Sequence, residues 1–269
     1  MANAHASPVL KHHFEDLGQQ HACERLGMWM FLATEILFFG GLFAAYTIYR
    51  MLYPHEFEIA SSFMNRQIAT VNTVFLITSS LTMTLAIRCA KLGDRAGLIR
   101  NLILTVALGT AFMVMKGFEY AHEFHENLAP GKMFRTEYEK ATRAVAGLAP
   151  AAADEYFKAD AAKPEHERAH AHWAAEQALK NKASADEVVD SGKVQMFLCF
   201  YFVMTGIHGI HIVVGLGLIL WLVYEAATGG IPPENYSTVE VVSLYWHLVD
   251  AIWLFLMPLL YLAGAGMHH

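Results

Sequence analysis

The stretch LGMWMFLATEILFFGGLFAAYTIY, from Leu26 to Tyr49, decides the fold class of this chain. Its one charged residue is Glu35, and nearly all of its other side chains are apolar. A helix needs about 20 predominantly apolar residues to cross the hydrocarbon core of a bilayer, which is about 30 Å thick. The stretch therefore predicts a membrane-spanning helix.

Four further apolar segments follow along the chain. They lie near residues 69–87, 101–120, 194–224 and 241–263. Hydrophobic residues make up 55% of the 269-residue chain, which is more than an ordinary soluble domain carries. We therefore expect an all-α, polytopic membrane bundle of five transmembrane helices with an extramembrane, partly helical insert.

The composition divides the chain into four segments. Residues 1–25 form a polar tail, residues 26–122 hold helices one to three, residues 123–193 form the insert, and residues 194–269 hold helices four and five. The insert is rich in Ala, Glu, Lys, His and Asp and has too few apolar residues for a core of its own. We expect it to lean on another subunit, with a solvated arm as the alternative.

Charges around the short connection between spans two and three predict the topology. Arg88, Lys91, Arg95 and Arg100 stand there against a single acid, Asp94. Basic loops stay on the cytoplasmic side of a membrane. The N-terminus is therefore predicted to be cytoplasmic and the insert extracytoplasmic.

Charge, cysteines and motifs exclude several classes of function. The net charge of −6 and the lack of a basic face argue against nucleic-acid binding. The cysteines Cys23, Cys89 and Cys199 are widely separated, so neither a disulfide framework nor a thiolate metal site is expected. No nucleophile elbow, phosphate-binding loop or HExxH motif occurs, which argues against a self-contained enzyme.

Glu35 is the first candidate functional residue, because an ionisable group inside a membrane span is costly and is by default a functional hypothesis. Gly40 and Gly41 follow it and would let a helix or a lipid chain approach closely. We expect Glu35 to be buried and to be either a lipid-anchoring, proton-exchanging carboxyl or a protonated acid bonded to a neighbouring helix. No residue of the chain is predicted to be catalytic.

The remaining spans carry polar residues for which packing and ligand binding are both conceivable. Hydroxyls of the second span can bond to their own backbone or to a neighbouring helix. His208 and His211 could be ligands of haem or copper. Neutral histidines that bond to a neighbouring carboxyl group would explain their presence in a membrane helix equally well. We favour a helix-bundle polar network without a metal, made of Asn72, Glu119, His208, His211, Glu240, His247 and Asp250.

Three stretches resemble the signature segments of haem-copper oxidase subunit III. They are TEILFFGGLF from Thr34, TGIHGIHIVVG from Thr205 and YWHLVDAIWLF from Tyr245. Asn72-Thr73, Ser79-Ser80 and Glu119-Tyr120 resemble the intervening ones. The resemblance covers all five spans, omits residues 1–20 and the insert, and fits the five-span bacterial form rather than the seven-span mitochondrial form.

The resemblance implies a subunit that has no haem or metal of its own and lies beside the catalytic subunit I and other oxidase subunits. Haem and copper belong to those partners, which reduce O2 to water and translocate protons. The family implies bound phospholipid in a cleft, a lipid-cleft role for Glu35, and support for proton uptake and stability. His208, His211, His247 and Asp250 match positions that hold the helix bundle together.

Two other functions remain open at this level. An accessory subunit of a nitric oxide reductase would look similar, and a free-standing transporter or haem-binding membrane protein would use Glu35, His208 and His211 directly. The long insert 123–193 is predicted to contact cytochrome c or a neighbouring respiratory complex. Whether the electron donor is a quinol or cytochrome c, and which haem the partner holds, is decided in other subunits.

Overall fold

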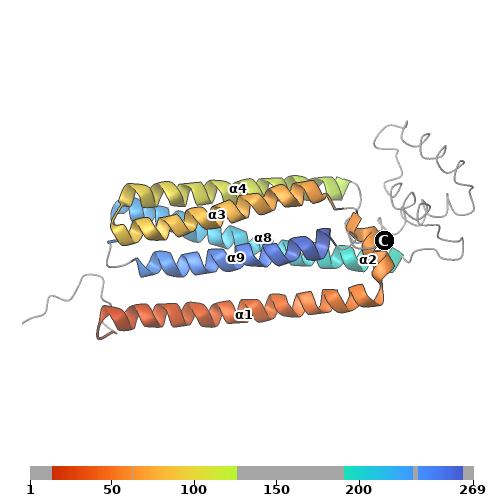
Figure 1. Cartoon of the computed structure of the whole chain (residues 1–269), viewed down its shortest axis with the longest axis horizontal. Coiled ribbons are helices and arrows are strands. Elements are labelled where there is room, and N and C mark those ends of the chain that lie inside the picture. The colour runs from red at the N-terminus through yellow and green to blue at the C-terminus, as the bar shows by residue number, and fades with distance from the viewer. Residues whose placement is uncertain (1–13, 63, 126–190, 233–235, 263–269) are drawn as a thin grey trace, which may run out of the picture. The chain divides into compact units, whose positions relative to one another are not determined.

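The computed structural model describes residues 14–62, 64–125, 191–232 and 236–262, all of which belong to helices or to the short joints between them (Figure 1). The helices are α1 (Leu17–Leu52), α2 (Pro54–Ser62), α3 (Arg66–Leu92), α4 (Arg95–His125), α8 (Ser191–Thr228) and α9 (Ser237–Tyr261). Most of the predicted insert and the first part of the predicted tail lie outside the described residues.

The all-helical fold and the five spans predicted from the sequence are confirmed for the part of the chain that the structure describes. Five of its helices are long and apolar enough to cross a membrane, namely α1, α3, α4, α8 and α9. The exception is α2, which the sequence analysis did not predict. It is short, and Pro54 occupies its first position, where the missing N–H of proline costs nothing.

The helices extend beyond the apolar windows, most clearly at the start of α1. That helix begins at Leu17, inside the segment assigned to the polar tail. The Asp16 Oδ1 atom accepts a hydrogen bond from the backbone N of Gln19 at 2.6 Å, as an N-cap does. Hydropathy marks only the part of a helix that suits the bilayer, so a polar first turn is invisible to it.

The chain divides into two compact units. The first unit contains Met1–Phe43, Thr70–Met115 and Gly206–Leu256, and the second contains Ala44–Ala69, Lys116–Thr205 and Met257–His269. Each long helix contributes residues to both units. Candidate functional groups occur in each unit separately.

Trp246 is the centre of the first unit. Its ring is fully buried and touches glycines of two other helices, because a Cβ atom at Gly109 of α4 or at Gly215 of α8 would lie 2.8 Å from that ring. The Trp246 Nε1–H group donates to Ser79 Oγ of α3 at 3.1 Å. One tryptophan thus joins four helices, with glycines making room for it.

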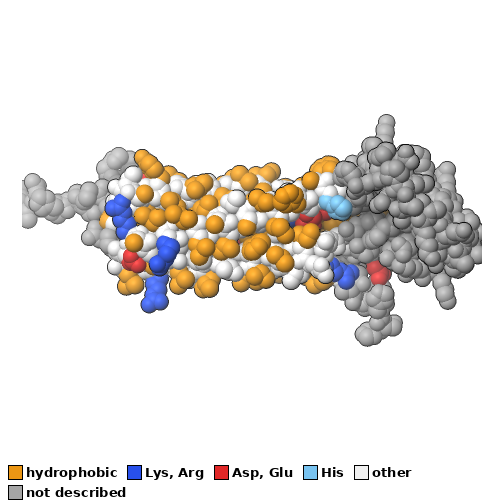
Figure 2. Space-filling view, turned by 90° about the horizontal axis from the view of Figure 1, so that it is seen from above, with side chains coloured by type: hydrophobic (Ala, Val, Ile, Leu, Met, Phe, Trp, Pro, Cys, Tyr) orange, Lys and Arg blue, Asp and Glu red, His pale blue; other side chains and the backbone are white. Residues whose placement is uncertain are grey.

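α1 buries a smaller fraction of its most apolar window than the other spanning helices do. Only 11% of its most apolar window is buried, against 56% for α9. Leu37 and Ile36 are among its exposed residues, at 76% and 53%. On the face drawn in Figure 2, hydrophobic side chains are spread over the described surface. Such a surface suits contact with lipid or with other membrane helices.

The second unit has an aromatic core around Tyr46. The rings of Phe57 in α2 and Phe197 in α8 lie 5.5 and 6.1 Å from the ring of Tyr46. The Tyr46 hydroxyl donates to the carbonyl oxygen of Leu259 at 2.7 Å. In the same unit Arg66 Nε donates to the Tyr261 carbonyl at 3.0 Å and thereby caps the C-terminal end of α9.

Candidate functional site: polar groups within the spanning helices

Glu35 of α1 pairs with His211 of α8. The Glu35 Oε2 atom lies 3.0 Å from His211 Nε2, and the two side chains are 18% and 19% exposed. Glu35 is therefore half-buried, whereas a buried side chain was predicted from the sequence, because few described residues pack against α1. The Phe39 ring, 5.5 Å from the His211 ring, flanks the pair.

The number of protons on the Glu35–His211 pair follows from a second hydrogen bond, which His211 makes. His211 Nδ1 lies 2.8 Å from the carbonyl oxygen of Ile207, and a carbonyl can only accept, so Nδ1 carries a proton. Nε2 then either accepts from a protonated Glu35 or, in an imidazolium, donates to a carboxylate. In both cases one proton is shared between the two residues, and the pair as a whole is neutral.

Gly40 and Gly41 do not face another described helix. A Cβ atom built at either position would meet no described atom within 4 Å. The close approach that these glycines predict is therefore not made within the described part of this chain. They leave a smooth surface on α1, one to two turns from Glu35.

His208 and His211 come from one helix but turn to different neighbours. The ring of His208 stacks on that of Trp253 of α9 at 5.4 Å and meets Phe112 of α4 edge-on at 5.8 Å. His211 turns to α1 instead. The two imidazoles are thus separate packing and hydrogen-bonding groups, and no group of three or more His, Cys, Asp or Glu side chains suited to a metal occurs among the described residues.

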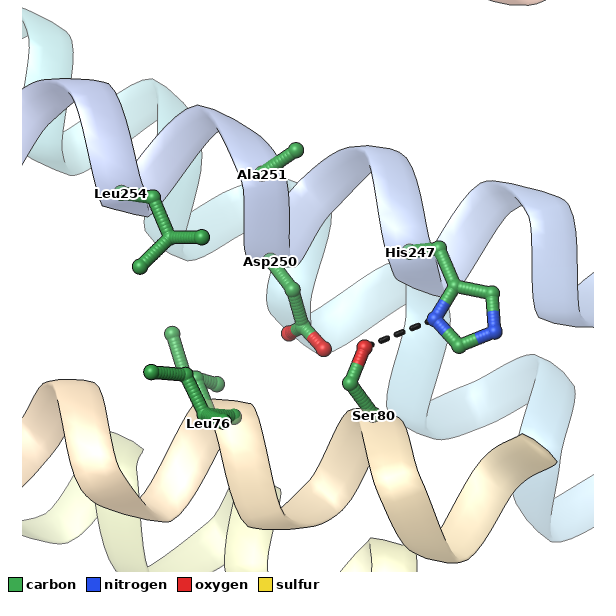
Figure 3. Close-up of a pocket in the computed structure, with 7 residues that line it drawn as sticks. Leu76, Ser80, His247, Asp250, Ala251 and Leu254 are labelled. Atoms are coloured by element: carbon green, nitrogen blue, oxygen red, sulfur yellow. Dashed lines mark hydrogen bonds between the residues drawn. The ribbon is translucent and has the colours of Figure 1, made fainter. Parts of the chain in front are cut away.

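His247 and Asp250 line one pocket between α3 and α9, shown in Figure 3. His247 Nδ1 lies 2.7 Å from Ser80 Oγ of α3, a bond that ties the two helices together. Asp250 is 5% exposed. The described residues make no hydrogen bond of ordinary geometry to its carboxyl oxygens, but the hydroxyls of Ser79 and Ser80 are within reach of the carboxyl. The rest of the lining is apolar, from Leu76, Ile77, Ala251 and Leu254.

Among the described residues, the second unit holds a buried charge cluster whose lysine and tyrosines were not predicted from the sequence. Lys116 Nζ donates to Glu119 Oε2 at 2.9 Å, to Tyr261 OH at 2.6 Å and to Tyr201 OH at 3.1 Å. Tyr261 in turn donates to Glu119 Oε1 at 2.5 Å, and Tyr201 donates to Glu123 Oε1 at 2.7 Å. All five side chains are buried.

This Lys116 cluster changes the interpretation of the end of α4. Glu119, His122 and Glu123 are three or four residues apart, a spacing typical of one helix face, but His122 is exposed while both acids are buried. With one ammonium group and two carboxyl groups, the cluster is neutral only when it holds one extra proton. Spacing within α4 could not reveal the tyrosines, because they come from α8 and α9.

The predicted network has two other members, Asn72 and Glu240, and they differ in whether the side chain has a polar partner. Glu240 at the start of α9 forms a 2.5 Å ion pair with Lys91 near the end of α3. Asn72 is fully buried, and its side-chain oxygen and nitrogen have no hydrogen-bond partner among the described residues. Asn72 is thus placed in the core of the first unit without joining a network there.

Comparison with known proteins places the chain in a family. The sequence matches the family model described as cytochrome c oxidase subunit III over residues 15–126 and 173–265. "Quinol oxidase subunit 3" of Bacillus subtilis is 24% identical over 247 residues, which are 90% of this chain and 87% of that protein. "Cytochrome c oxidase subunit 3" of Thermostichus vulcanus is 25% identical, over 88% of this chain and 86% of that protein.

A third relative, "Cytochrome bo(3) ubiquinol oxidase subunit 3" of Pseudomonas putida, is 24% identical over 89% of this chain and 85% of that protein. The family match covers residues on both sides of the insert and includes all five spanning helices. The chain belongs to the cytochrome c oxidase subunit III family.

Proposed function

We propose that this chain is the accessory subunit III of an aerobic haem-copper terminal oxidase. The observation that carries the proposal is the family match, which extends over all five spanning helices. In this role the chain associates with a catalytic subunit that holds haem and copper and reduces O2 to water. It holds no haem or metal itself, and it resides in a bacterial cytoplasmic membrane with its N-terminus inside.

The arrangement of the polar groups supports a structural role for most of them. His211, His247 and Glu240 each connect two helices through a hydrogen bond or an ion pair. His208 is held between aromatic rings. These contacts position helices, as polar groups in membrane bundles do, and they leave the chemistry of O2 reduction to the partner.

Glu35 has the further role of a lipid-linked proton group. It shares one proton with His211 and lies on a helix whose exposed surface includes Gly40 and Gly41. A phospholipid chain can lie along that smooth surface, with the Glu35–His211 pair beside it. Through this pair the subunit supports proton uptake and durability of the catalytic subunit during turnover.

The insert is the docking region on the outer side of the membrane in this proposal. Residues 123–193 contact cytochrome c or a neighbouring respiratory complex there. A deletion of residues 130–190 should slow electron transfer from the donor or release the neighbouring complex while the oxidase still assembles. Unaltered donor kinetics and unaltered assembly would make the insert a passive arm.

Affinity purification of the intact complex through a tag on this chain tests the proposal. The expected result is co-purification with a haem-containing subunit, O2 consumption by the complex, and no haem or metal in this chain when it is dissociated. Co-purification with a subunit that reduces nitric oxide instead of O2 would assign the chain to a reductase. Haem bound to the isolated chain would contradict the accessory role.

A further inference from the structure

The Lys116 cluster of the second unit contains two buried acids but one cation. Glu119 and Glu123 are 5% and 3% exposed, and Lys116 is 7% exposed. Among the described residues, Lys116 is the one cation that acts electrostatically on Glu123. A net charge is costly to bury. We therefore expect the cluster to hold one proton more than an ammonium group and two carboxylates would carry.

Glu119 has the contacts of an ionised carboxylate. Lys116 Nζ donates to its Oε2 atom at 2.9 Å, and Tyr261 OH donates to its Oε1 atom at 2.5 Å. Lys116 Nζ also donates to Tyr261 OH at 2.6 Å and to Tyr201 OH at 3.1 Å. An ammonium group has three N–H donors, one for each of these contacts. The cation of the cluster is therefore paired with Glu119.

Glu123 has fewer partners than Glu119. Its Oε1 atom lies 2.7 Å from Tyr201 OH, while its Oε2 atom is buried and has no hydrogen-bond partner within the described ranges. An unpaired carboxylate oxygen is much more costly to bury than the unpaired carbonyl oxygen of a neutral acid. The geometry therefore favours a proton on the Oε1 atom of Glu123, with Oε2 as the carbonyl oxygen.

Tyr201 connects the two acids. Its hydroxyl lies 2.7 Å from Glu123 Oε1 and 3.0 Å from Glu119 Oε1, but it has a single proton and can donate to only one of them. When Glu123 is protonated, its Oε1–H group donates to Tyr201, and Tyr201 donates to Glu119. When Glu119 is protonated instead, both hydrogen bonds reverse and Tyr201 donates to Glu123. The two states have the same net charge.

We propose that the Lys116 cluster is a proton-binding site in which Glu119 and Glu123 share one proton through Tyr201, with Glu123 as its resting position. In the transfer, the Oε1–H bond of Glu123 breaks, that proton binds to the Tyr201 oxygen, and the proton of Tyr201 passes to Glu119 Oε1. The two acids are four residues apart on α4, so the proton moves by about one helical turn. The site uses neither Glu35 nor His211 and does not depend on the proposed function.

Infrared difference spectroscopy of the purified full chain in detergent tests the protonation. A protonated carboxyl group has a C=O stretching band that a carboxylate lacks. At neutral pH the wild type minus Glu123→Gln spectrum should show this band with the intensity of one carboxyl group, because the subtraction cancels unchanged acids such as Glu35. The control is Glu240→Gln, whose acid pairs with Lys91 and should give no band. Absence of the band for Glu123→Gln would overturn the proposal.

Glu119→Gln distinguishes a shared proton from a proton that Glu123 holds by itself. In this variant the cluster has one ammonium group and one acid, so it is neutral without an extra proton. Glu123 should then be ionised, and its band should disappear although Glu123 itself is unchanged. A band that persists in Glu119→Gln would show that Glu123 is protonated through its own burial, and the sharing would be refuted.

Tyr201→Phe tests the connection while both acids stay in place, and phenylalanine keeps the ring, so the variant should fold. The Glu123 O–H group loses its acceptor, and the band should remain but change in frequency. The matched control is Tyr120→Phe, which removes a hydroxyl that pairs with Thr205 and with neither acid and should leave the band in place. A band that is unchanged in Tyr201→Phe would contradict the role of Tyr201.

Discussion

Glu35 and His211 form the polar contact that ties α1 to α8, with 3.0 Å between Oε2 and Nε2. A second side-chain hydrogen bond holds α1 in the first unit, because Ser237 Oγ of α9 donates to Glu24 Oε2 at 2.6 Å. The shared proton makes the Glu35–His211 pair neutral, which suits a position open to lipid.

A double-mutant cycle on Glu35 and His211 measures this contact. Glu35→Leu should destabilise the chain in detergent, and the coupling to His211→Leu should be about 0.6 kcal/mol and at most about 1.7 kcal/mol, the mean and the maximum found for interhelical hydrogen bonds in a membrane protein. Glu35→Gln should cost less, because its amide can donate to the neutral Nε2 atom. Unfolding by denaturant in detergent gives the free energies, and zero coupling would show that the Glu35–His211 contact does not stabilise the attachment of α1.

Glu35→Gln also tests the proton role, since glutamine keeps a hydrogen bond but cannot exchange a proton. In the purified oxidase we expect faster inactivation during turnover and less bound phospholipid than in the wild type. Glu240→Gln is the control, because it removes a carboxyl of this chain that pairs with Lys91 and not with His211. Equal inactivation rates and lipid contents in Glu35→Gln and the wild type would refute the proton and lipid role.

The packing of Trp246 predicts opposite effects of alanine at two glycines. Gly109→Ala places a methyl group 2.8 Å from the Trp246 ring, and such overpacking should cost about 1–3 kcal/mol of stability. Gly217→Ala of α8 meets no described atom within 4 Å, so it should leave stability unchanged or raise it slightly through helix propensity. Thermal unfolding of the two variants in one detergent makes the comparison, and equal melting temperatures would contradict the packing described for Trp246.

The Gly40→Leu variant tests whether the surface around Gly40 contacts the rest of this chain or contacts lipid or a partner subunit. The isolated chain should keep its stability, since the position faces no described atom. If a lipid chain or a helix lies along this surface, the same variant should lose phospholipid or partner subunits from the complex. A loss of stability in the isolated chain would instead place a segment of this chain against Gly40.

The Lys116 cluster should be the most sensitive polar site in the second unit. Lys116→Met leaves two buried carboxyl groups without their cation, and breaking a buried pair in this way costs about 3–5 kcal/mol. Lys91→Met, which removes a lysine from an ion pair whose lysine is 47% exposed, should cost at most about 1 kcal/mol. Denaturant unfolding in detergent ranks the two, and comparable losses would mean that the cluster is accessible to water.

Some features of this protein can be predicted from the linear sequence, and others depend on which residues are neighbours in space. Hydropathy identifies each spanning helix because the bilayer demands a long apolar segment whatever the helix contacts. It missed the polar first turn of α1 and the short helix α2, which the bilayer does not select. Spacing placed His208 and His211 near each other on α8, but it could not tell that one turns to Trp253 and the other to Glu35.

The sequence by itself determined the all-helical class, the five spans and the family, because these depend on composition and on motifs read along one chain. Only the tertiary structure decided the partners of the polar groups. Lys116 meets Tyr201 and Tyr261, and Glu35 meets His211, across more than 80 residues of sequence in each case. A hydrogen bond depends on separations of about 3 Å between atoms of different helices, and those separations are set by how the helices pack.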